Sequence, residues 1–167
     1  MTLQNISQGP LSLGNTRKGE IRTQFGAICY RKVKSKPEIL LITSRGRGRW
    51  LVPKGWPMAG QTPADSAAQE AFEEAGIQGH AHPQCVGIYS YTKGKPGGGA
   101  LPCVVALYPV EVTRVLRRFP EQGERKRRWF SPKRAAEMVQ EPELRQILCH
   151  FDPGEFPPAL TMRRRRS

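Results

Sequence analysis

The sequence predicts an α/β fold in which a mixed β-sheet lies between helices on both faces. Strand-like runs come first, followed by one helical segment, more strand-like runs and two final helical segments. That order is typical of a sheet whose helices are divided between its faces. The 167 residues, 38% of them hydrophobic, can bury one core, so we expect one folded domain.

The first part of the chain is expected to be an arm followed by three strands. Residues 1–20 are rich in Gly, Ser, Gln and Asn, which favours a flexible arm. Apolar or loosely alternating runs at 22–33, 38–43 and 50–53 predict strands. The basic, glycine-containing stretch 44–49 predicts the turn that joins the second strand to the third.

The first helical segment has a start signal and a stop signal. Residues 54–61 contain Gly and Pro, which predicts a loop. Thr62 is a good N-cap residue, and Pro63 suits the first helical position. Gly76 can adopt the left-handed conformation that often ends a helix. We therefore expect a helix that begins after Thr62 and ends at Gly76.

The second half of the chain returns to strands and closes with helices. The expected elements are strands at 84–92, 101–113 and 125–131, a flexible hairpin loop at 93–99, and helices at 132–139 and 142–150. The folded domain should therefore span residues 21–152. Residues 153–167 include four successive arginines and are expected to form a basic, disordered tail.

The charge of the chain predicts anionic partners. Lys and Arg number 27 against 14 Asp and Glu, a formal net charge of +13, and a positive field concentrates polyanions at the surface. Nucleic acid, a membrane surface and polyphosphorylated small molecules all fit, and charge alone does not choose among them. No apolar run approaches the roughly 20 residues that span a bilayer, so we expect no membrane segment.

The cysteines favour a reducing compartment. Cys29, Cys85, Cys103 and Cys149 form no C-x-x-C pair, which disfavours a zinc site. The first three lie in apolar, strand-like runs, where Cys usually packs as a small hydrophobe. We interpret all four as reduced thiols and expect a cytoplasmic protein.

Three glutamates of the first predicted helix form the chemical centre of the sequence. Glu70, Glu73 and Glu74 follow the spacing i, i+3 and i+4, which places them on one side of the helix. Their mutual repulsion is not offset by any Lys or Arg between Thr62 and Gly76. A hard divalent cation would offset it, because carboxylate oxygens suit Mg²⁺ or Mn²⁺. The alternative, from spacing alone, is a solvated acidic face.

The segment from Gly55 to Ile77 resembles the Nudix box. That pattern is a Gly, five residues, a Glu, seven residues, and then Arg-Glu-apolar-any-Glu-Glu-any-Gly-apolar. The residues that match in register are Gly55, Glu70, Ala71, Glu73, Glu74, Gly76 and Ile77. Two positions depart, because Gln61 replaces a Glu and Gln69 replaces the Arg that usually orients a box carboxylate. The carboxylates are therefore expected to be held less firmly.

The resemblance extends over about residues 22–151. The runs 49–57 and 123–130 are similar to the branch of diphosphoinositol polyphosphate phosphohydrolases. This resemblance implies the fold of the Nudix α/β/α sandwich. It also implies a pyrophosphohydrolase that acts on diphosphoinositol polyphosphates or dinucleoside polyphosphates. One alternative is a nucleotide-sanitising or RNA 5′-end pyrophosphohydrolase. Another, from a different class, is a non-catalytic Nudix domain that binds phosphorylated ligands or RNA.

The same resemblance implies roles for individual residues. Glu70, Glu73 and Glu74 would hold Mg²⁺, with Mn²⁺ as the alternative, and the backbone carbonyl of Lys54 or Gly55 would complete its shell. Glu70 would assist deprotonation of the attacking water, and Glu74 would be the most central metal ligand. Metal-bound hydroxide is the alternative base.

Basic residues near the box are candidates for holding the other phosphates of the substrate. The candidates are Arg22, Arg47, Arg49, Lys54, Lys126 and Arg127. Arg suits bidentate phosphate contacts and Lys supplies a mobile point charge, although each could equally serve solubility. Trp50 and Trp56 either stack on an adenine or pack the loop. We expect a monomer or weak dimer, with nucleic acid as a further partner left open by the basic surface.

Overall fold

The structure is a computed structural model that describes residues 22–94 and 97–156. Its elements in chain order are β1 (Arg22–Val33), β2 (Lys36–Thr43), β3 (Trp50–Leu51), β4 (Lys54–Gly55), α1 (Pro63–Ala75), β5 (Ile77–Ala81), β6 (Gly87–Gly94), β7 (Ala100–Val115), β8 (Arg127–Phe130), α2 (Pro132–Met138), α3 (Pro142–Cys149) and the 3₁₀ helix η1 (Pro153–Glu155). The arm expected at 1–20 and residues 157–167 of the expected tail lie outside the described residues.

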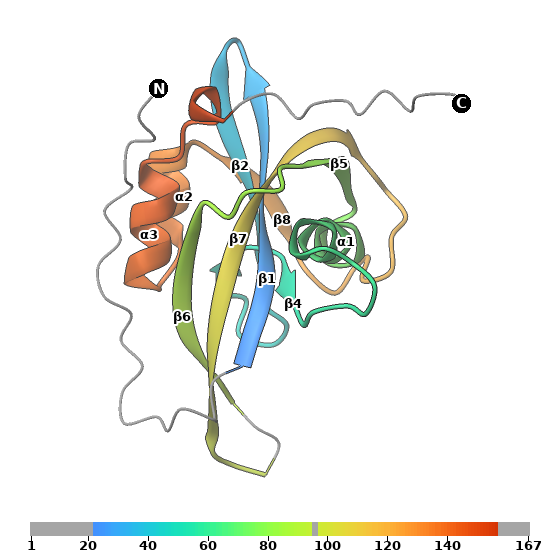
Figure 1. The fold of residues 1–167 in the computed structure, drawn as a ribbon, viewed down its shortest axis with the longest axis vertical. Coiled ribbons are helices and arrows are strands. Elements are labelled where there is room, and N and C mark those ends of the chain that lie inside the picture. Colours follow the sequence, from blue (N-terminus) through green and yellow to red (C-terminus); the bar gives the residue numbers. More distant parts are fainter. Residues whose placement is uncertain (1–21, 95–96, 157–167) are drawn as a thin grey trace.

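Within the described residues, eight strands form one mixed sheet with the order β3-β2-β1-β7-β5 (Figure 1). Strands β1 and β7 run parallel at its centre. The other pairs are antiparallel, with β4 on β1, β6 on β7 and β8 on β2. The sheet and its flanking helices confirm the expected α/β class.

Strand β1 shares one of its edges between two partners. Its first half pairs with β4, where Phe25 is opposite Gly55 and Gly26 is opposite Lys54. Its second half pairs with β2, beginning at Tyr30. Because α1 packs against both β1 and β4, this division brings the start of the box next to the box helix.

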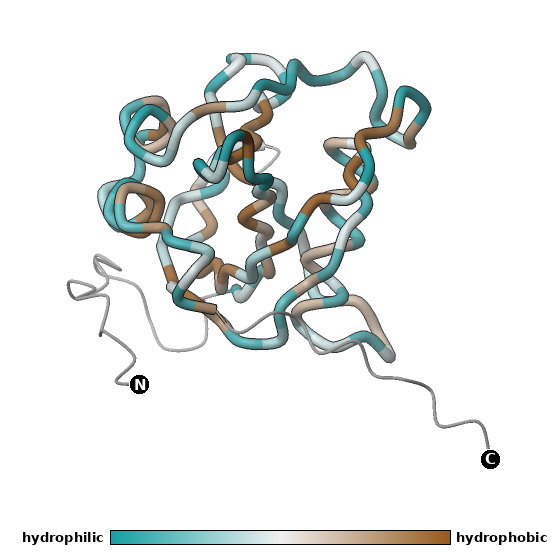
Figure 2. The backbone as a smooth tube through the Cα atoms, turned by 90° about the horizontal axis from the view of Figure 1, so that it is seen from above, coloured by the Kyte–Doolittle hydropathy of each residue, from teal (hydrophilic) through white to brown (hydrophobic). Residues whose placement is uncertain are grey.

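The helices cover opposite faces of the sheet, with α1 on one side and α2 and α3 on the other (Figure 1). Each face buries its own hydrophobic cluster. Figure 2 shows the hydrophobic segments gathered in the interior strands, with hydrophilic residues towards the periphery. No helix in the described part of the chain is both long and apolar enough to cross a bilayer.

The ends of α1 confirm the two local signals. The Thr62 hydroxyl accepts a hydrogen bond from the Asp65 N–H at 3.2 Å, and Pro63 occupies the first turn. Gly76 has φ of +65° and its N–H donates to the Phe72 carbonyl. A Cβ at Gly76 would also lie 2.4 Å from the Phe119 ring, so both conformation and space favour glycine here.

Four local expectations were wrong at their boundaries or omitted an element. Residues 54–55, expected to be loop, form β4 by pairing with β1. Strand β5 was not expected, because its middle residues are exposed and lack alternation. The strand expected from residue 125 begins at Arg127. The described fold continues past 152 into η1, and the Phe156 ring packs 5.7 Å from that of Phe151.

The cysteines are free thiols in different environments. Cys29 and Cys103 are buried in the sheet, and Cys85 is half-buried, as expected for small hydrophobic residues. Cys149, at the end of α3, is exposed. Burial raises the pKa of Cys29 to about 12, and the nearby charge of Glu74 adds to the effect. Cys29 is therefore an unreactive core residue.

Candidate active site

Two carboxyl groups of α1 lie on its buried side. The alanines of this helix pack against the sheet, and Glu70 and Glu74 lie one turn apart beside them. Each glutamate is only 9% exposed. Buried carboxylates are rare unless they are paired or bind a cation, so the surroundings of these two determine what the site can do.

The absence of a side chain at Gly55 leaves room for the carboxylate of Glu70. A Cβ built on Gly55 would lie 2.1 Å from Oε1 of Glu70, far inside contact distance. The residue is held in β4 by its pairing with Phe25. Glycine is therefore required here by close approach of the carboxylate, and its φ is not in the left-handed region. The glycine of the box and its first helix glutamate fit as one unit.

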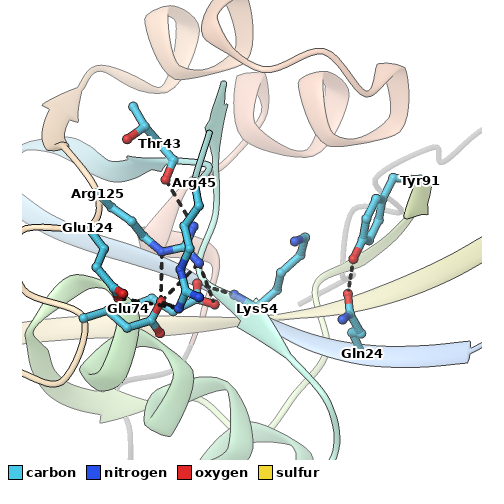
Figure 3. A network of polar contacts seen from close by, with 9 residues as sticks. Gln24, Thr43, Arg45, Lys54, Glu74, Tyr91, Glu124 and Arg125 are labelled. Atoms are coloured by element: carbon cyan, nitrogen blue, oxygen red, sulfur yellow. Dashed lines mark hydrogen bonds and ion pairs between the residues drawn. The ribbon is translucent and has the colours of Figure 1, made fainter. Parts of the chain in front are cut away.

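Glu74 is held by one backbone group and one guanidinium (Figure 3). The Lys54 N–H donates a hydrogen bond to its Oε2 at 3.3 Å. The Nη2 atom of Arg125 lies 3.7 Å from its Oε1. Both side chains of the ion pair are largely buried, at 12% and 11% exposure. This pair should therefore count for more than a solvated one.

Arg125 connects the carboxylates to the loop that precedes β8. Its Nη1 donates to the Thr43 carbonyl at 3.1 Å, and its Nη2 lies 3.3 Å from Oε1 of Glu121. Arg45 also donates to Glu121, and lies 3.5 Å from Glu124 (Figure 3). A chain of alternating charges thus runs from α1 to the β2–β3 turn.

Sequence reasoning did not single out Arg125 or Glu121. Arg125 is one of several neighbouring cations and lies 51 positions after Glu74. Its only available signal was its place in the run 123–130, where the resemblance to the phosphohydrolase branch continues. The contact itself depends on how the β7–β8 connection folds over α1, where the Glu121 N–H donates to the Glu73 carbonyl.

Glu73 faces a different partner from the other two glutamates. Nε2 of Gln69 donates to its Oε1 at 3.0 Å, an i, i+4 contact on the helix surface. The amide of Gln69 therefore makes an uncharged contact with a box carboxylate. In the described part of the chain, no three His, Cys, Asp or Glu side chains already form a metal-binding group. The three carboxylates share one side of α1 but are held by separate protein donors.

Burial changes the acidity of the two inner glutamates. It raises the pKa of Glu70 to about 7, with the charges of Glu73 and Glu121 adding to the shift. It also raises the pKa of Glu74 to about 7, although Arg125 acts in the opposite direction. The neighbouring cations thus offset only part of the desolvation cost.

The donor set fits a hard divalent cation. Carboxylate oxygens are the ligands that Mg²⁺ and Mn²⁺ prefer, and the two inner carboxyl groups are buried with too little cationic compensation to hold their pKa at an ordinary value. Gly55 adds no side chain between them and β4. Glu70, Glu73 and Glu74 are thus the residues that would hold such an ion.

Lys54 is the basic candidate most closely joined to the carboxylates. Burial lowers the pKa of its ammonium group, and the charge of Glu74 partly opposes that shift. Its Nζ lies 4.6 Å from the centre of the Tyr91 ring, a cation–π contact. The Tyr91 hydroxyl donates to Oε1 of Gln24 at 2.6 Å (Figure 3). Lys54, Tyr91 and Gln24 thus form a polar cluster beside the box, called here the floor of the site.

The other cations differ in position. Arg22 is exposed at the start of β1, and Arg47 is exposed in the β2–β3 turn. Arg49 donates to Oε1 of Gln140 at 2.9 Å, so this turn reaches the α2–α3 connection. The backbone N–H of Lys126 donates to the Thr43 hydroxyl at 2.9 Å, and the Lys126 side chain is exposed.

Arg127 has a structural environment that argues against the substrate contact expected for it. Its guanidinium donates to the carbonyls of Ala75 at 2.7 Å and Leu116 at 2.6 Å. It also lies over the Phe119 ring, 4.9 Å from the ring centre. Arg127 therefore caps the carboxyl end of α1.

Trp50 and Trp56, the two tryptophans considered for stacking, have separate environments. Trp50 packs edge-on against Phe130, with ring centres 5.2 Å apart, which supports its packing role. Trp56 is 40% exposed. Nζ of Lys93, from the end of β6, lies 5.2 Å from the centre of its ring. Trp56 is thus the more exposed of these two and can be reached by a ligand.

Glu141 is a further carboxylate near the floor that sequence reasoning did not select. Among the described residues, its Oε2 is a buried side-chain atom without a hydrogen-bond partner. Its negative charge acts on Lys54 and on Tyr89. No local sequence pattern distinguishes it from the other glutamates of the chain.

Comparison with known proteins agrees with this geometry. The NUDIX domain model matches residues 21–151. Nudix hydrolase 13, mitochondrial, from Arabidopsis thaliana is 30% identical over 150 residues, covering 78% of this chain and 73% of that protein. Diphosphoinositol polyphosphate phosphohydrolase 3-beta from Homo sapiens is 26% identical over 121 residues, covering 71% and 70%.

A solved structure shares the fold. The C. elegans Ap4A hydrolase binary complex superposes with a TM-score of 0.56 at 23% identity, covering 77% of this chain and 93% of that one. The family match includes both the box helix and the elements that hold it. The chain therefore belongs to the Nudix domain family, and it is a Nudix-type hydrolase.

Proposed function

We propose that this protein is a metal-dependent pyrophosphohydrolase that cleaves a diphosphate linkage in a highly phosphorylated small molecule. The observation that carries the proposal is the pair of buried carboxyl groups, Glu70 and Glu74, set against Gly55 and flanked by Lys54 and Arg125. Such an arrangement suits a reaction in which negative charge must be positioned and neutralised.

Glu70, Glu73 and Glu74 are the residues proposed to hold Mg²⁺, with Mn²⁺ as the alternative. An ion held there would supply positive charge that stabilises the negative charge of the diphosphate and makes a nearby water more acidic. The carbonyl of Lys54 or Gly55 is the proposed backbone ligand. We assign Glu70 to accept the proton of the attacking water; its carboxylate occupies the space that Gly55 leaves free of a side chain.

The remaining residues position charge. Arg125 keeps the Glu74 carboxylate oriented through Oε1, while the Lys54 N–H holds Oε2. The Lys54 ammonium group, fixed over Tyr91, supplies a cation on the floor of the site. Arg22, Arg47, Arg49 and Lys126 are the proposed outer contacts for further phosphates. The shielded cations, Lys54 and Arg125, should stabilise developing negative charge more than these solvated ones.

Two substrate classes are proposed, dinucleoside polyphosphates and diphosphoinositol polyphosphates. The exposed cations suit both classes. One relative is a diphosphoinositol polyphosphate phosphohydrolase, and one similar structure is an Ap4A hydrolase. We further propose a cytoplasmic monomer or weak dimer, with no membrane association. Nucleotide sanitising and hydrolysis of RNA 5′ ends remain the alternatives within the enzyme class.

The test is hydrolysis by the purified full chain, with and without Mg²⁺. The panel contains diadenosine tetraphosphate, a diphosphoinositol polyphosphate, 8-oxo-dGTP and triphosphorylated RNA. We expect metal-dependent release from one of the first two, and a loss of about a thousandfold in kcat for Glu74→Gln. Glu137→Gln, an exposed glutamate on α2 paired with Arg134, should retain full activity.

Other outcomes would change the assignment. Preference for 8-oxo-dGTP or RNA would favour one of the two enzyme alternatives. Release that persists in Glu74→Gln would refute the proposed site. No release from any substrate, together with metal-independent binding of one of them, would favour the non-catalytic phosphate-binding alternative.

A further inference from the structure

A cavity lies against the flank of α1 that carries Asp65 and Phe72. Its volume is about 530 Å³, within the range of about 300–1,000 Å³ that small-molecule sites occupy. The loop before α1, the outer side of that helix and the start of β5 form its wall. The lining residues are Gly60, Gln61, Asp65, Ala68, Gln69, Phe72, Ile77, Gln78 and Gly79.

The wall of this cavity is built from anchored segments. The Gln61 N–H donates to the Met58 carbonyl at 3.2 Å, and the Met58 N–H donates to the buried Ser66 hydroxyl at 3.4 Å. On the strand side, the Thr113 hydroxyl donates to the Gln78 carbonyl at 3.2 Å. These hydrogen bonds hold both sides of the cavity in place.

An irregularity in β5 shapes the strand side of the cavity. The β5–β7 register shifts between Gln78 and Gly79. A Cβ on Gly79 would lie 2.1 Å from the Glu111 carbonyl oxygen, so only glycine allows this approach. Bulges are common beside functional sites, where they change the direction of a side chain.

The chemistry of the wall selects a class of ligand. Gln61, Gln69 and Gln78 offer amide donors and acceptors, and Asp65 adds an acceptor for amino groups. Phe72 is half-buried and belongs to neither hydrophobic cluster. Among the residues described along this wall, none is a Lys or Arg. The wall therefore suits an uncharged planar heterocycle that carries amino groups, and disfavours phosphate.

Both departures from the Nudix pattern lie on this one wall. Gln61 and Gln69 stand where the pattern has a Glu and an Arg. Two neutral amides thus replace two opposite charges, which leaves polar groups that can pair with a neutral ligand. Gln69 also donates to Glu73, so the cavity and the proposed metal site share a side chain.

We propose that this cavity binds the base of a purine nucleoside. The Phe72 ring stacks on the base, and the amides with Asp65 pair with its edge. The base comes either from a separate nucleoside or from the nucleoside end of a substrate. Only the second source rests on the proposed function.

Binding is measured first without metal or hydrolysis, by titrating adenosine, guanosine and ribose 5-phosphate into the full chain. We expect a purine nucleoside to bind and ribose 5-phosphate not to bind. Phe72→Leu should weaken binding by about tenfold, because base–aromatic stacking is lost. Gln78→Ala changes an exposed residue and should weaken it by about threefold to tenfold. Gln84→Ala, an exposed glutamine off the wall, should bind like wild type.

The comparison of variants decides the proposal. Circular dichroism and thermal unfolding identify any variant that fails to fold. If Phe72→Leu does not fold, the binding test rests on Gln78→Ala alone. Absence of nucleoside binding overturns the proposal. So does binding that is equal in wild type, Gln78→Ala and the folded Phe72 variant.

Kinetics then separate the two sources of the base. If the substrate places its base here, Gln78→Ala raises KM for diadenosine tetraphosphate and adenosine inhibits competitively. If the site takes a separate nucleoside, KM is unchanged and adenosine alters kcat or has no kinetic effect. A protein that binds nucleosides but hydrolyses nothing would refute the proposed function and leave this site established.

Discussion

The two faces of the sheet are covered by helices with side chains of very different size. Helix α1 packs through Ala67, Ala71 and Ala75, whereas α3 packs through Leu144, Ile147 and Leu148. A fully buried large aliphatic side chain contributes about 1.5–3 kcal/mol to stability, and an alanine contributes much less. The α3 face is thus built mainly for stability.

The α1 face uses small residues for another purpose. Ala67, Ala71 and Ala75 are fully buried, so the helix lies against β1 and β4 through small side chains. This brings Glu70 within contact of Gly55 and Glu74 within reach of the Lys54 N–H. The comparison predicts that changes on the α3 face reduce stability, whereas changes around the α1 carboxylates reduce activity.

The largest expected effect is on the α3 face. Leu148→Ala should lower the free energy of unfolding by about 2–5 kcal/mol, because it leaves a cavity in the core. At 25 °C its kcat and KM should change by less than about twofold, because Leu148 lies among the apolar residues of this face. Denaturant unfolding and steady-state kinetics test both parts.

Gln146→Ala is the matched control, since its side chain is exposed on the same helix and should alter stability by about 0.5 kcal/mol or less. A large loss of activity in the folded Leu148 variant would break the division between the two faces.

The next effect is at the close approach of β4 and α1. Gly55→Ala places a Cβ 2.1 Å from Oε1 of Glu70, so the carboxylate must move. We expect about a hundredfold loss of kcat, as for other displacements of about 1 Å at a reacting centre, with a much smaller change in stability. Gly94→Ala controls for the added methyl group, because nothing lies within 4 Å of a Cβ there. Equal activity of the two variants would contradict the role of Gly55.

A smaller effect is expected from the residue that orients Glu74. Arg125→Met removes the guanidinium and keeps an unbranched apolar side chain. We expect the Mg²⁺ concentration for half-maximal activity to rise about tenfold, as is typical when a partner of a metal ligand is lost. Arg134→Met, which breaks an exposed ion pair on α2, should not change it. An unchanged Mg²⁺ requirement would show that Arg125 only fastens the β7–β8 connection.

Local signals account for what the sequence predicted well. The bounds of α1 follow from Thr62, Pro63 and Gly76, each of which acts through its own backbone or its nearest neighbours. The box glutamates follow from helical spacing, since a shared face needs no tertiary information. The fold class follows from the order of such elements along the chain.

Tertiary contacts account for what the sequence did not predict. Arg125 meets Glu74 only after the β7–β8 connection folds over α1. Arg127, two residues later, instead binds the carbonyls at the end of that helix. The two cations are indistinguishable by composition and spacing. Strand β5 was also missed, because it forms by pairing with β7 rather than from an alternating pattern of its own.

The smallest expected effect concerns the cost of burying carboxylates on the α1 face without metal. Burial raises the pKa of both Glu70 and Glu74 from an ordinary value of 4.5 to about 7. Between those values the folded state holds more protons than the unfolded state. The free energy of unfolding of the metal-free protein should therefore fall as pH rises through this window and level off above it.

Glu70→Gln removes one of the two titrating groups and so should flatten this pH dependence. We expect the Tm of the metal-free wild type to fall between pH 5 and pH 8 by about 2–4 °C more than that of the variant, roughly the effect of 1 kcal/mol at this chain length. Thermal unfolding in a chelator measures the difference, with Glu137→Gln as the exposed control. Parallel curves for wild type and Glu70→Gln would mean that Glu70 is well solvated in solution. Added Mg²⁺ should stabilise wild type most at pH 8. The carboxylates are deprotonated there, so they bind the ion, and its positive charge offsets their mutual repulsion. The buried residues of α3 itself are Leu144, Ile147 and Leu148, so their contribution to stability should not depend on pH or metal in this way.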